Sequence, residues 1–506
     1  MTAAVGTGCL QGVDAQPVRV EATFEGEGKP HILGQVDTAV REACQRVMSA
    51  FLASGLPTPR RGGMVVNFSP ATFRKTGPGF DLPLAAVLAA AAGMTPADAC
   101  AGLAAYGEVG LDGRILPVEG AIPVALAARA AGARILLVSP EDAPCVGLVA
   151  GIAVLPVRDL AEVLGWLRGE LELAPAPPPV PRAAGDELDL ADIRGHETPK
   201  RALAVAAAGR HNLLLVGPPG SGKSALARRL PGLLPPPSDA EALEILKVRS
   251  AHGTIPPDLG RQRPFRAPHH TSSTPSLLGG GKGPRPGELT LAHQGVLFLD
   301  ELPEFRREAL EGMRQPLEDG QLTIGRAQAT ITMPAAFLLV GAMNPCPCGW
   351  HGHPSRPCAC PAAARQRYLQ RLSGPLLDRL DLQVEVPALD PRRLREPADP
   401  EWGTARLRDA VAEAAARQAQ RNTFRDGFVP NGRLQDRQLE RAVRPTQAVQ
   451  DALERVLRAF RLSGRARVRL LRIARTLADL DARDAVAPDD VVEAARMRGY
   501  EARGGR

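Results

Sequence analysis

Along its first third, the chain alternates short apolar runs typical of strands with longer alanine-rich segments of helical spacing. The strand-like runs are residues 18–24, 64–68 and 134–138, and the helix-like segments are residues 38–52, 82–92 and 121–131. Short apolar runs bounded by turn residues favour strands, whereas apolar residues three and four apart favour helices. The pattern therefore predicts an α/β unit over residues 1–170.

Two further units follow a proline-rich segment. Residues 175–181 read Pro-Ala-Pro-Pro-Pro-Val-Pro, which cannot form a regular helix or a central strand and runs extended as a stiff spacer. Beyond it, strand and helix signals alternate again, and from residue 402 helical periodicity continues almost throughout. We therefore expect a multidomain α/β protein with these parts: residues 1–170, a linker over 171–185, a second α/β unit over 186–390 and an all-helical unit over 391–506.

Composition agrees with several globular domains. The chain has 506 residues, of which 44% are hydrophobic, and this is too long for one core. The N-terminus lacks a basic segment followed by an apolar core, and the longest apolar stretch is too short to span a bilayer, so we expect a cytoplasmic protein without a membrane partner. A net charge of +7 is compatible with a polyanionic partner, although charge alone does not decide this.

Residues 217–224 carry the strongest chemical signal, because they lie between an apolar run and a helix-forming stretch. They are Gly217, Pro218, Pro219, Gly220, Ser221, Gly222, Lys223 and Ser224. Glycines let successive backbone N–H groups turn toward phosphates, and the following helix presents its positive end to them. Lys223 is expected to reach the β and γ phosphates of ATP, and Ser224 to ligate Mg²⁺. A glycine turn that merely joins a strand to a helix would need neither side chain.

Two acids follow the next buried-strand signal. The apolar run 296–299 leads directly into Asp300 and Glu301, as expected of a parallel strand, buried on both faces, that delivers side chains at its carboxyl end. We expect Asp300 to hold Mg²⁺ through water and Glu301 to orient the attacking water. Alone, the pair would be read as a solvated acidic turn, but the phosphate loop upstream favours ATP hydrolysis.

Two more residues complete the predicted ATPase site. Asn344 follows the apolar run 336–340 and is expected to contact the γ phosphate or the lytic water. Arg379 lies in the sequence Leu-Leu-Asp-Arg-Leu-Asp at a predicted helix end, suited to cross a subunit boundary and meet a neighbour's γ phosphate. Such an arginine can be worth roughly 10³ to 10⁵ in turnover. Taken alone, Asp-Arg-Leu-Asp is more often a surface charge cluster.

Together these pieces resemble the AAA+ superfamily, and further motifs resemble the magnesium-chelatase-like ComM/YifB family. The motifs are Phe-Arg-Ala-Pro-His-His-Thr-Ser-Ser at 265–273, the glycine-rich 279–287, Gly-Glu-Leu-Thr-Leu-Ala-His at 287–293 and Asn-Pro-Cys-Pro-Cys-Gly at 344–349. The resemblance spans essentially the whole chain. It implies a hexameric ring ATPase and a DNA helicase that drives branch migration during natural transformation, with recombination proteins as further partners.

The same resemblance assigns a role to the helical third. It implies an AAA+ lid of the magnesium-chelatase C-terminal type, in which residues 463–467 fit the arginine that senses the nucleotide state. Arg465 is the first choice for this arginine, and Arg467 is the second.

The resemblance also covers the first unit. Residues 77–81 and 106–118 look like the Lon-protease fold, which is ribosomal S5 domain 2-like, found at the N-terminus of this family. Gly79 stands where the proteolytic serine would be, and residues 119–123 offer no lysine. Because a nucleophile and its activating base are both missing, we do not expect peptide hydrolysis.

Four of the eight cysteines crowd into a Gly/Pro-rich loop: Cys346, Cys348, Cys358 and Cys360. Four soft ligands are typical of a closed structural zinc site, although the C-x-C spacing is tighter than the usual C-x-x-C. His351 and His353 lie within the loop and could replace one thiolate. A disulfide pair is the alternative, which a cytosolic compartment disfavours. Because the loop follows Asn344, a metal there would stiffen the segment linked to γ-phosphate sensing.

Two loops could face the channel of a ring. One is residues 279–287 with Lys282 and Arg285, and the other is the hairpin-like 321–333 with Arg326 near its tip. Basic loop tips can grip a phosphate backbone without reading sequence, so branched or single-stranded DNA is the expected partner. Two alternatives stay open, a metal-chelatase-type motor subunit and an ATP-dependent protein remodeller, because AAA+ cores do not specify their cargo.

Overall fold

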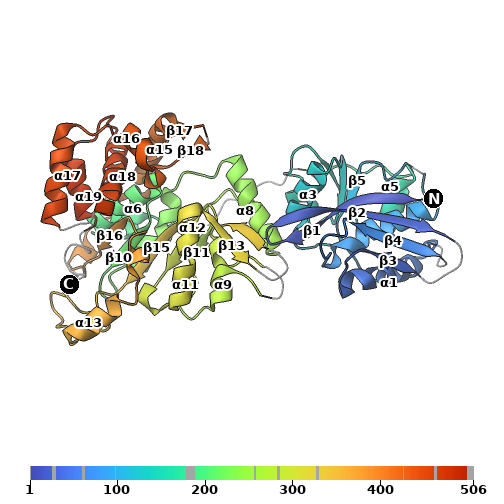
Figure 1. Cartoon of the computed structure of the whole chain (residues 1–506), viewed down its shortest axis with the longest axis horizontal. Coiled ribbons are helices and arrows are strands. Elements are labelled where there is room, and N and C mark those ends of the chain that lie inside the picture. Colours follow the sequence, from blue (N-terminus) through green and yellow to red (C-terminus); the bar gives the residue numbers. More distant parts are fainter. Residues whose placement is uncertain are drawn as a thin grey trace.

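The structure is a computed structural model, and it describes most of the chain. The described ranges are residues 2–25, 30–59, 63–96, 98–177, 188–255, 258–281, 285–325, 330–390, 392–425, 427–460 and 464–498. Residues up to 177 form one end of an elongated molecule, and the remainder forms a larger body at the other end (Figure 1). None of the helices in these ranges is long and apolar enough to cross a membrane.

A mixed sheet organises the N-terminal part. Within the described ranges it has seven strands in the order β3-β4-β2-β1-β5-β8-β9. A long antiparallel hairpin, β1 (Ala3–Gln11) and β2 (Asp14–Phe24), runs through its middle. The other strands are β3 (His31–Leu33), β4 (Met64–Ser69), β5 (Leu103–Ala105), β8 (Ile135–Val138) and β9 (Ala153–Pro156), beside a small hairpin of β6 (Glu108–Val109) and β7 (Ile115–Leu116).

The helices of this part cover the sheet. They are α1 (Thr38–Ala53), α2 (Asp81–Ala91), α3 (Ala121–Ala130), α4 (Ala143–Val146) and α5 (Leu160–Leu167). Every residue of α2 is buried, which fits a helix that is apolar on all sides after its first residue. Strand β1 was not predicted from the sequence, because Gly6 and Gly8 weaken its strand signal. Gly8 lies under Val124 of α3, where a β-carbon would approach within 3.1 Å.

A second sheet lies at the centre of the larger body. Among the described residues it has five parallel strands in the order β11-β12-β15-β10-β16. These are β10 (Leu213–Val216), β11 (Phe265–Arg266), β12 (Val296–Leu299), β15 (Leu338–Met343) and β16 (Leu382–Glu385). The three central strands are buried throughout, as parallel strands covered on both faces must be. Their carboxyl ends meet at one edge of the sheet, where ligands bind in such folds.

Helices and one hairpin surround this sheet. The helices are α6 (Glu197–Gly209), α7 (Lys223–Arg229), α8 (Asp239–Ala251), α9 (Thr274–Leu278), α10 (Glu288–Leu291), α11 (Arg307–Gly312), α12 (Arg314–Asp319), α13 (Ala362–Leu369) and α14 (Gly374–Leu377). The hairpin pairs β13 (Gln321–Gly325) with β14 (Thr330–Pro334), where the sequence predicted a hairpin. Its tip, which includes Arg326, lies outside the described residues.

The C-terminal helices share a core with the sheet. They are α15 (Thr404–Arg421), α16 (Asp436–Val443), α17 (Gln447–Ala459), α18 (Gly464–Leu480) and α19 (Pro488–Arg496), with a short hairpin of β17 (Thr423–Phe424) and β18 (Gly427–Phe428). Helix α6 packs against both α15 and α18. A single cluster of buried apolar side chains therefore includes Leu213 of the sheet together with Val411 and Leu470.

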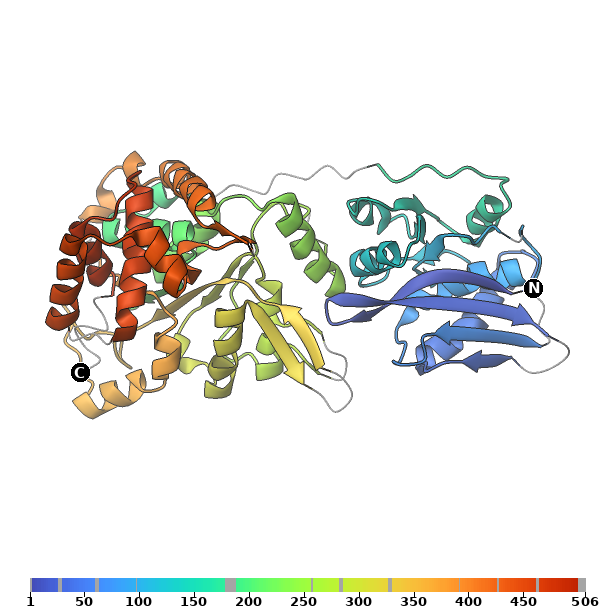
Figure 2. The ribbon, with the colours of Figure 1, turned by 45° about the horizontal axis from the view of Figure 1, so that its top comes forward.

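The N-terminal part contacts the larger body through α3 and α8 (Figure 2). The backbone N–H of Gly120 donates to the carbonyl of Ser250 over 2.8 Å, and the N–H of Ile122 donates to the Ser250 hydroxyl over 3.2 Å. Leu246 joins the apolar cluster of α3, and Lys247 lies 2.5 Å from Asp14. Specific contacts as well as the linker therefore connect the two parts.

Candidate active site

The phosphate loop and the ends of β12 and β15 surround one cavity. Its volume is about 390 Å³, and residues 219–225, Asp300, Glu301, Met343 and Asn344 line it. Gly220 and Gly222 have φ angles of 75° and 88°, a region that favours glycine. At Gly217 a β-carbon would lie 2.1 Å from the carbonyl oxygen of Val386. The glycine spacing seen in the sequence is thus required by backbone shape and by close packing.

Lys223 begins α7 and lies inside the loop. Its Nζ donates to the carbonyl oxygens of Gly217 and Pro218, over 2.7 and 2.8 Å, and lies 3.3 Å from Oδ1 of Asn344. Burial lowers the pKa of Lys223, and the nearby Asp300 and Glu301 partly offset this. A buried cation held by three oxygens is well placed to exchange them for phosphate oxygens.

Ser224 and Asp300 meet at the mouth of the loop. The Ser224 hydroxyl donates to Oδ2 of Asp300 over 2.7 Å, while Oδ1 of Asp300 accepts the backbone N–H of Glu301 over 2.9 Å. A hydroxyl and a carboxylate oxygen side by side are the hard ligands that Mg²⁺ prefers beside phosphates. The structure therefore brings together the two residues that the sequence analysis named for Mg²⁺.

Glu301 contacts a residue to which the sequence analysis gave no role. Nδ1 of His270 lies 3.0 Å from Oε2 of Glu301. The His270 ring also packs on His269, with centroids 4.1 Å apart, and against the edge of Phe305. His270 follows β11, which pairs with β12, so neighbouring strands deliver both side chains. The paired histidines at 269–270 were the available signal, but only the fold pairs one of them with Glu301.

A second histidine lies beside the loop without having been predicted. His196 precedes α6 with a φ angle of 61°, and its ring lies 3.9 Å from the position a β-carbon on Gly222 would take. Burial lowers the pKa of His196, so the ring is neutral at neutral pH. None of the ATPase motifs identified in the sequence includes His196, because the first of them begins at Gly217.

Comparison with known proteins identifies the family of the chain. Residues 189–394 match the family described as magnesium chelatase, subunit ChlI. Residues 18–142 match the family described as subunit ChlI of Mg-chelatase. Residues 401–498 match the C-terminal part of subunit ChlI of magnesium chelatase. The protein named YifB of Escherichia coli is 40% identical over 98% of this chain and 97% of the relative. Competence protein ComM of Haemophilus influenzae is 40% identical over 96% of this chain and 95% of the relative. The chain belongs to the ComM/YifB family. A more distant relative is the magnesium-chelatase 38 kDa subunit of Rhodobacter capsulatus, 27% identical over 60% of this chain and 85% of the relative.

Membership of this magnesium-chelatase-like family is consistent with an AAA+ ATPase that uses ATP and Mg²⁺. The mixed α/β architecture with its parallel sheet agrees with an AAA+-like domain. Among the predicted site residues, 219–224, Asp300, Glu301 and Asn344 line the same cavity.

Arg379 of this ComM/YifB family member lies away from that cavity. It lines a separate space of about 730 Å³ between the sheet and the C-terminal helices, together with Arg210, Arg314, Arg433, Arg469 and Arg472. Its guanidinium contacts Glu318 and donates to the carbonyl of Pro375 over 2.7 Å. The neighbouring Asp381 is buried with Oδ2 3.3 Å from Nδ1 of His211, so this sequence is only partly a surface charge cluster.

Of the remaining predicted basic residues, the structure describes the side chains of Arg467 and Arg285. Arg465 belongs to the first turn of α18, but its side chain is outside the described residues, as is all of Lys282. Arg467 lines a different pocket among the C-terminal helices. Arg285 is exposed and lies 3.4 Å from Glu119 of the N-terminal part.

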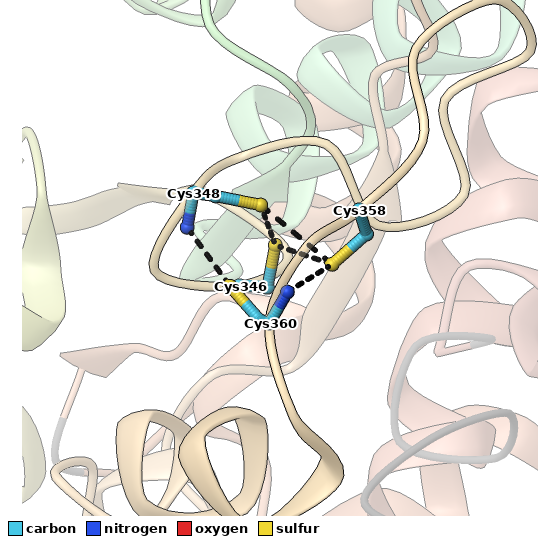
Figure 3. A group of neighbouring side chains, drawn as sticks. All are labelled: Cys346, Cys348, Cys358 and Cys360. Carbon is cyan, nitrogen blue, oxygen red and sulfur yellow. Dashed lines mark hydrogen bonds between the residues drawn. The ribbon is translucent and has the colours of Figure 1, made fainter.

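The four cysteines of the loop after β15 gather into one cluster (Figure 3). Their sulfur atoms all lie within 4.8 Å of one another. All four thiols are free, so the structure contains none of the disulfides considered as an alternative there. His351 and His353 are not part of this group of ligand atoms, and Nδ1 of His353 instead accepts the backbone N–H of Arg356 over 3.1 Å.

Gly79 in the N-terminal part has no room for a side chain. A β-carbon at this position would lie 2.1 Å from the Tyr106 ring. Tyr106 is held in place because its hydroxyl donates to the carbonyl of Glu119 over 2.8 Å. The space that a serine would need is therefore filled by an aromatic ring.

Proposed function

We propose that this protein is an ATP-hydrolysing AAA+ motor that moves along DNA as a hexameric ring. We further propose that it drives branch migration in recombination during natural transformation. The observation that carries the proposal is the convergence of Lys223, Ser224, Asp300, Glu301 and Asn344 on one cavity. The relative ComM is named a competence protein, which supports the biological setting.

Each side chain of the cavity has a role in hydrolysis. Lys223 binds the β and γ phosphates, and Ser224 and Asp300 would hold Mg²⁺, which neutralises charge that develops on the phosphates. Glu301 orients the attacking water, and the amide of Asn344, next to Lys223, senses the γ phosphate. Hydrolysis of this kind depends mainly on positioning and electrostatic stabilisation, which fixed groups at a sheet edge provide.

A ring accounts for the position of Arg379. Because Arg379 does not line the nucleotide cavity of its own chain, its charge is suited to a nucleotide on a neighbouring subunit. Six arginines, Arg379 included, line the same space against four acids, Glu318, Asp319, Asp378 and Asp381, so its lining carries more basic than acidic groups. A ring with such arginines between subunits would link hydrolysis in one subunit to its neighbour.

DNA as the substrate is supported by charge and by the sequence. The chain carries a net charge of +7, and the sequence predicts Lys282, Arg285 and Arg326 in turn-rich segments whose basic side chains could contact a phosphate backbone. Contacts of this kind are independent of sequence, as branch migration requires.

One experiment tests motor, partner and arginine together. ATPase rate is measured with and without a branched DNA junction at moderate salt, in wild type, in Arg379→Ala and in Arg158→Ala, an exposed arginine of the N-terminal part. We expect the junction to stimulate wild type and Arg158→Ala but not Arg379→Ala. Indifference to DNA would contradict the DNA motor. Stimulation by unfolded protein would then indicate a protein remodeller, and stimulation by a porphyrin-handling partner a chelatase-type motor.

A further inference from the structure

The cysteine cluster, defined as Cys346, Cys348, Cys358 and Cys360, lies directly beside the phosphate loop. We propose that this cluster binds one zinc ion and that the metal site braces the phosphate loop, so that nucleotide affinity depends on the metal. The inference rests on the nucleotide-binding part of the function proposed above and is independent of DNA.

The sulfur positions match a tetrahedral metal site. The Sγ atom of Cys346 lies 3.4 Å from that of Cys348 and 3.6 Å from that of Cys358, and the latter two are 3.6 Å apart. Zinc–sulfur bonds of about 2.3 Å in a tetrahedron place sulfur atoms about 3.8 Å apart. Disulfides need sulfur atoms about 2.05 Å apart, which none of these pairs approaches. Three sulfurs therefore have the spacing of zinc ligands, and the Sγ atom of Cys360 lies within 4.8 Å of each of them.

Backbone donors around the sulfurs favour thiolates. The N–H of Cys348 points at Sγ of Cys360 over 3.3 Å, and the N–H of Cys360 points at Sγ of Cys358 over 3.4 Å. Hydrogen bonds of this kind orient metal ligands and stabilise their negative charge. Because four sulfurs fill a tetrahedral shell, the site has no open position for a substrate and is structural.

The turn that follows the first two cysteines touches the nucleotide site. Gly349, which follows Cys348, has a φ angle of 83°, and a β-carbon there would lie 2.6 Å from Cδ of Pro219. Pro219 lines the nucleotide cavity. On the other side of Cys346, Asn344 contacts Lys223. A metal that fixes Cys346 and Cys348 thus fixes both contacts with the phosphate loop.

The second cysteine pair anchors the other end of the loop. Cys358 and Cys360 lead directly into α13, whose Tyr368 packs in the core beneath the sheet edge. Zinc binding would close the loop over 346–360 and remove the freedom of its ends. Without the metal, the turn at Gly349 would be held by far fewer interactions, and its contact with Pro219 would weaken.

The first test compares two cysteine substitutions in the full chain. Zinc content and the Kd for ATP are measured for wild type, Cys358→Ser and Cys145→Ser, a half-buried thiol outside the cluster. We expect about one zinc per chain in wild type and Cys145→Ser. In Cys358→Ser we expect loss of zinc and a Kd for ATP raised at least roughly tenfold, in the range seen when metal-site support is lost. Wild type purified without zinc and with four free thiols in this loop would overturn the metal site.

The second test isolates the contact with Pro219. Gly349→Ala and Gly352→Ala both place a side chain at positive φ in the same loop, but a β-carbon at Gly352 has no heavy atom within 4 Å. We expect both variants to keep zinc and only Gly349→Ala to weaken ATP binding, again by at least roughly tenfold. ATP binding by Gly349→Ala equal to that of Gly352→Ala would overturn the brace.

Folding is monitored separately, because a cysteine variant can simply fail to fold. Wild type is treated with a zinc-selective chelator, its circular dichroism is recorded, and zinc is then added back in the presence of Mg²⁺. We expect ATP affinity to fall and to return while the helical signal stays. Unchanged affinity after removal of zinc overturns the brace. Wild type that holds zinc but never binds ATP would instead contradict the proposed ATPase function.

Discussion

Nδ1 of His270 lies 3.0 Å from Oε2 of Glu301, the carboxylate proposed to orient the attacking water. Glu301 has a φ angle of 52°, a strained value for a residue with a side chain, and strain of this kind concentrates at functional sites. A half-exposed carboxylate on a strained turn needs a fixed partner to hold one position. His270, anchored against Phe305, supplies that partner.

Substitution of His270 should therefore slow hydrolysis without weakening nucleotide binding. We expect His270→Ala to reduce kcat roughly tenfold or more, with little change in KM, because the loss concerns positioning of the base. His270→Asn, which keeps a donor, should recover part of the rate. His269→Ala controls for loss of the packing between the two rings and should cost less, because Nδ1 of His269 contacts Thr271 and not Glu301. Equal losses in His269→Ala and His270→Ala would contradict this role.

The two central residues of the cavity should have separable effects. Lys223→Ala should lose nucleotide binding, because its amine is the cation among the carbonyl oxygens of the loop. Glu301→Gln should bind ATP but hydrolyse it slowly, because the amide cannot act as a base. Binding by equilibrium titration and turnover under saturating ATP separate the two effects. Normal turnover in either variant would refute the site.

Introducing a serine at position 79 should destabilise the N-terminal part. The Tyr106 ring occupies the space, and overpacking of this kind costs about 1–3 kcal/mol. We expect Gly79→Ser to lower Tm and Tyr106→Ala to relieve part of that loss, so that the two effects are not additive in a double-mutant cycle. Additive effects would show that the ring is not the obstacle.

Glu241 should make stability depend on acid pH. Burial raises the pKa of Glu241, but the backbone N–H of Ser238 and the charges of Arg263 and Arg210 outweigh it and lower the pKa to about 2. A carboxylate with a depressed pKa stabilises the fold at pH values above about 4.3, the pKa of glutamate in the unfolded chain. This stabilisation is lost as the pH falls toward 2.

The corresponding measurement is Tm against pH for wild type and Glu241→Gln. The variant should melt lower than wild type near neutral pH, and the gap should shrink between about pH 4.3 and 2. Glu413→Gln, at an exposed position of α15, is the control and should follow wild type throughout. A gap that stays constant with pH would contradict the ion-pair account.

Local sequence predicted the parts of the fold and site that depend on neighbours along the chain. The phosphate loop at 217–224 and the acids at 300–301 were identifiable because a buried parallel strand must deliver them at its carboxyl end. The ends of the strands were predicted less accurately than these motifs. The run 336–340 became β15 (Leu338–Met343), because pairing with β10 and β12, which a single segment cannot reveal, sets the register.

By itself, then, the sequence determined a phosphate-binding strand–loop–helix, two acids at a strand end, four clustered cysteines and family membership through its motifs. Only the tertiary structure decided that His270 meets Glu301, that Gly349 rests on Pro219 and that Tyr106 fills the space at Gly79. The physical reason is separation along the chain. Backbone geometry and apolar periodicity are local, whereas these contacts join segments brought together by strand order and core packing.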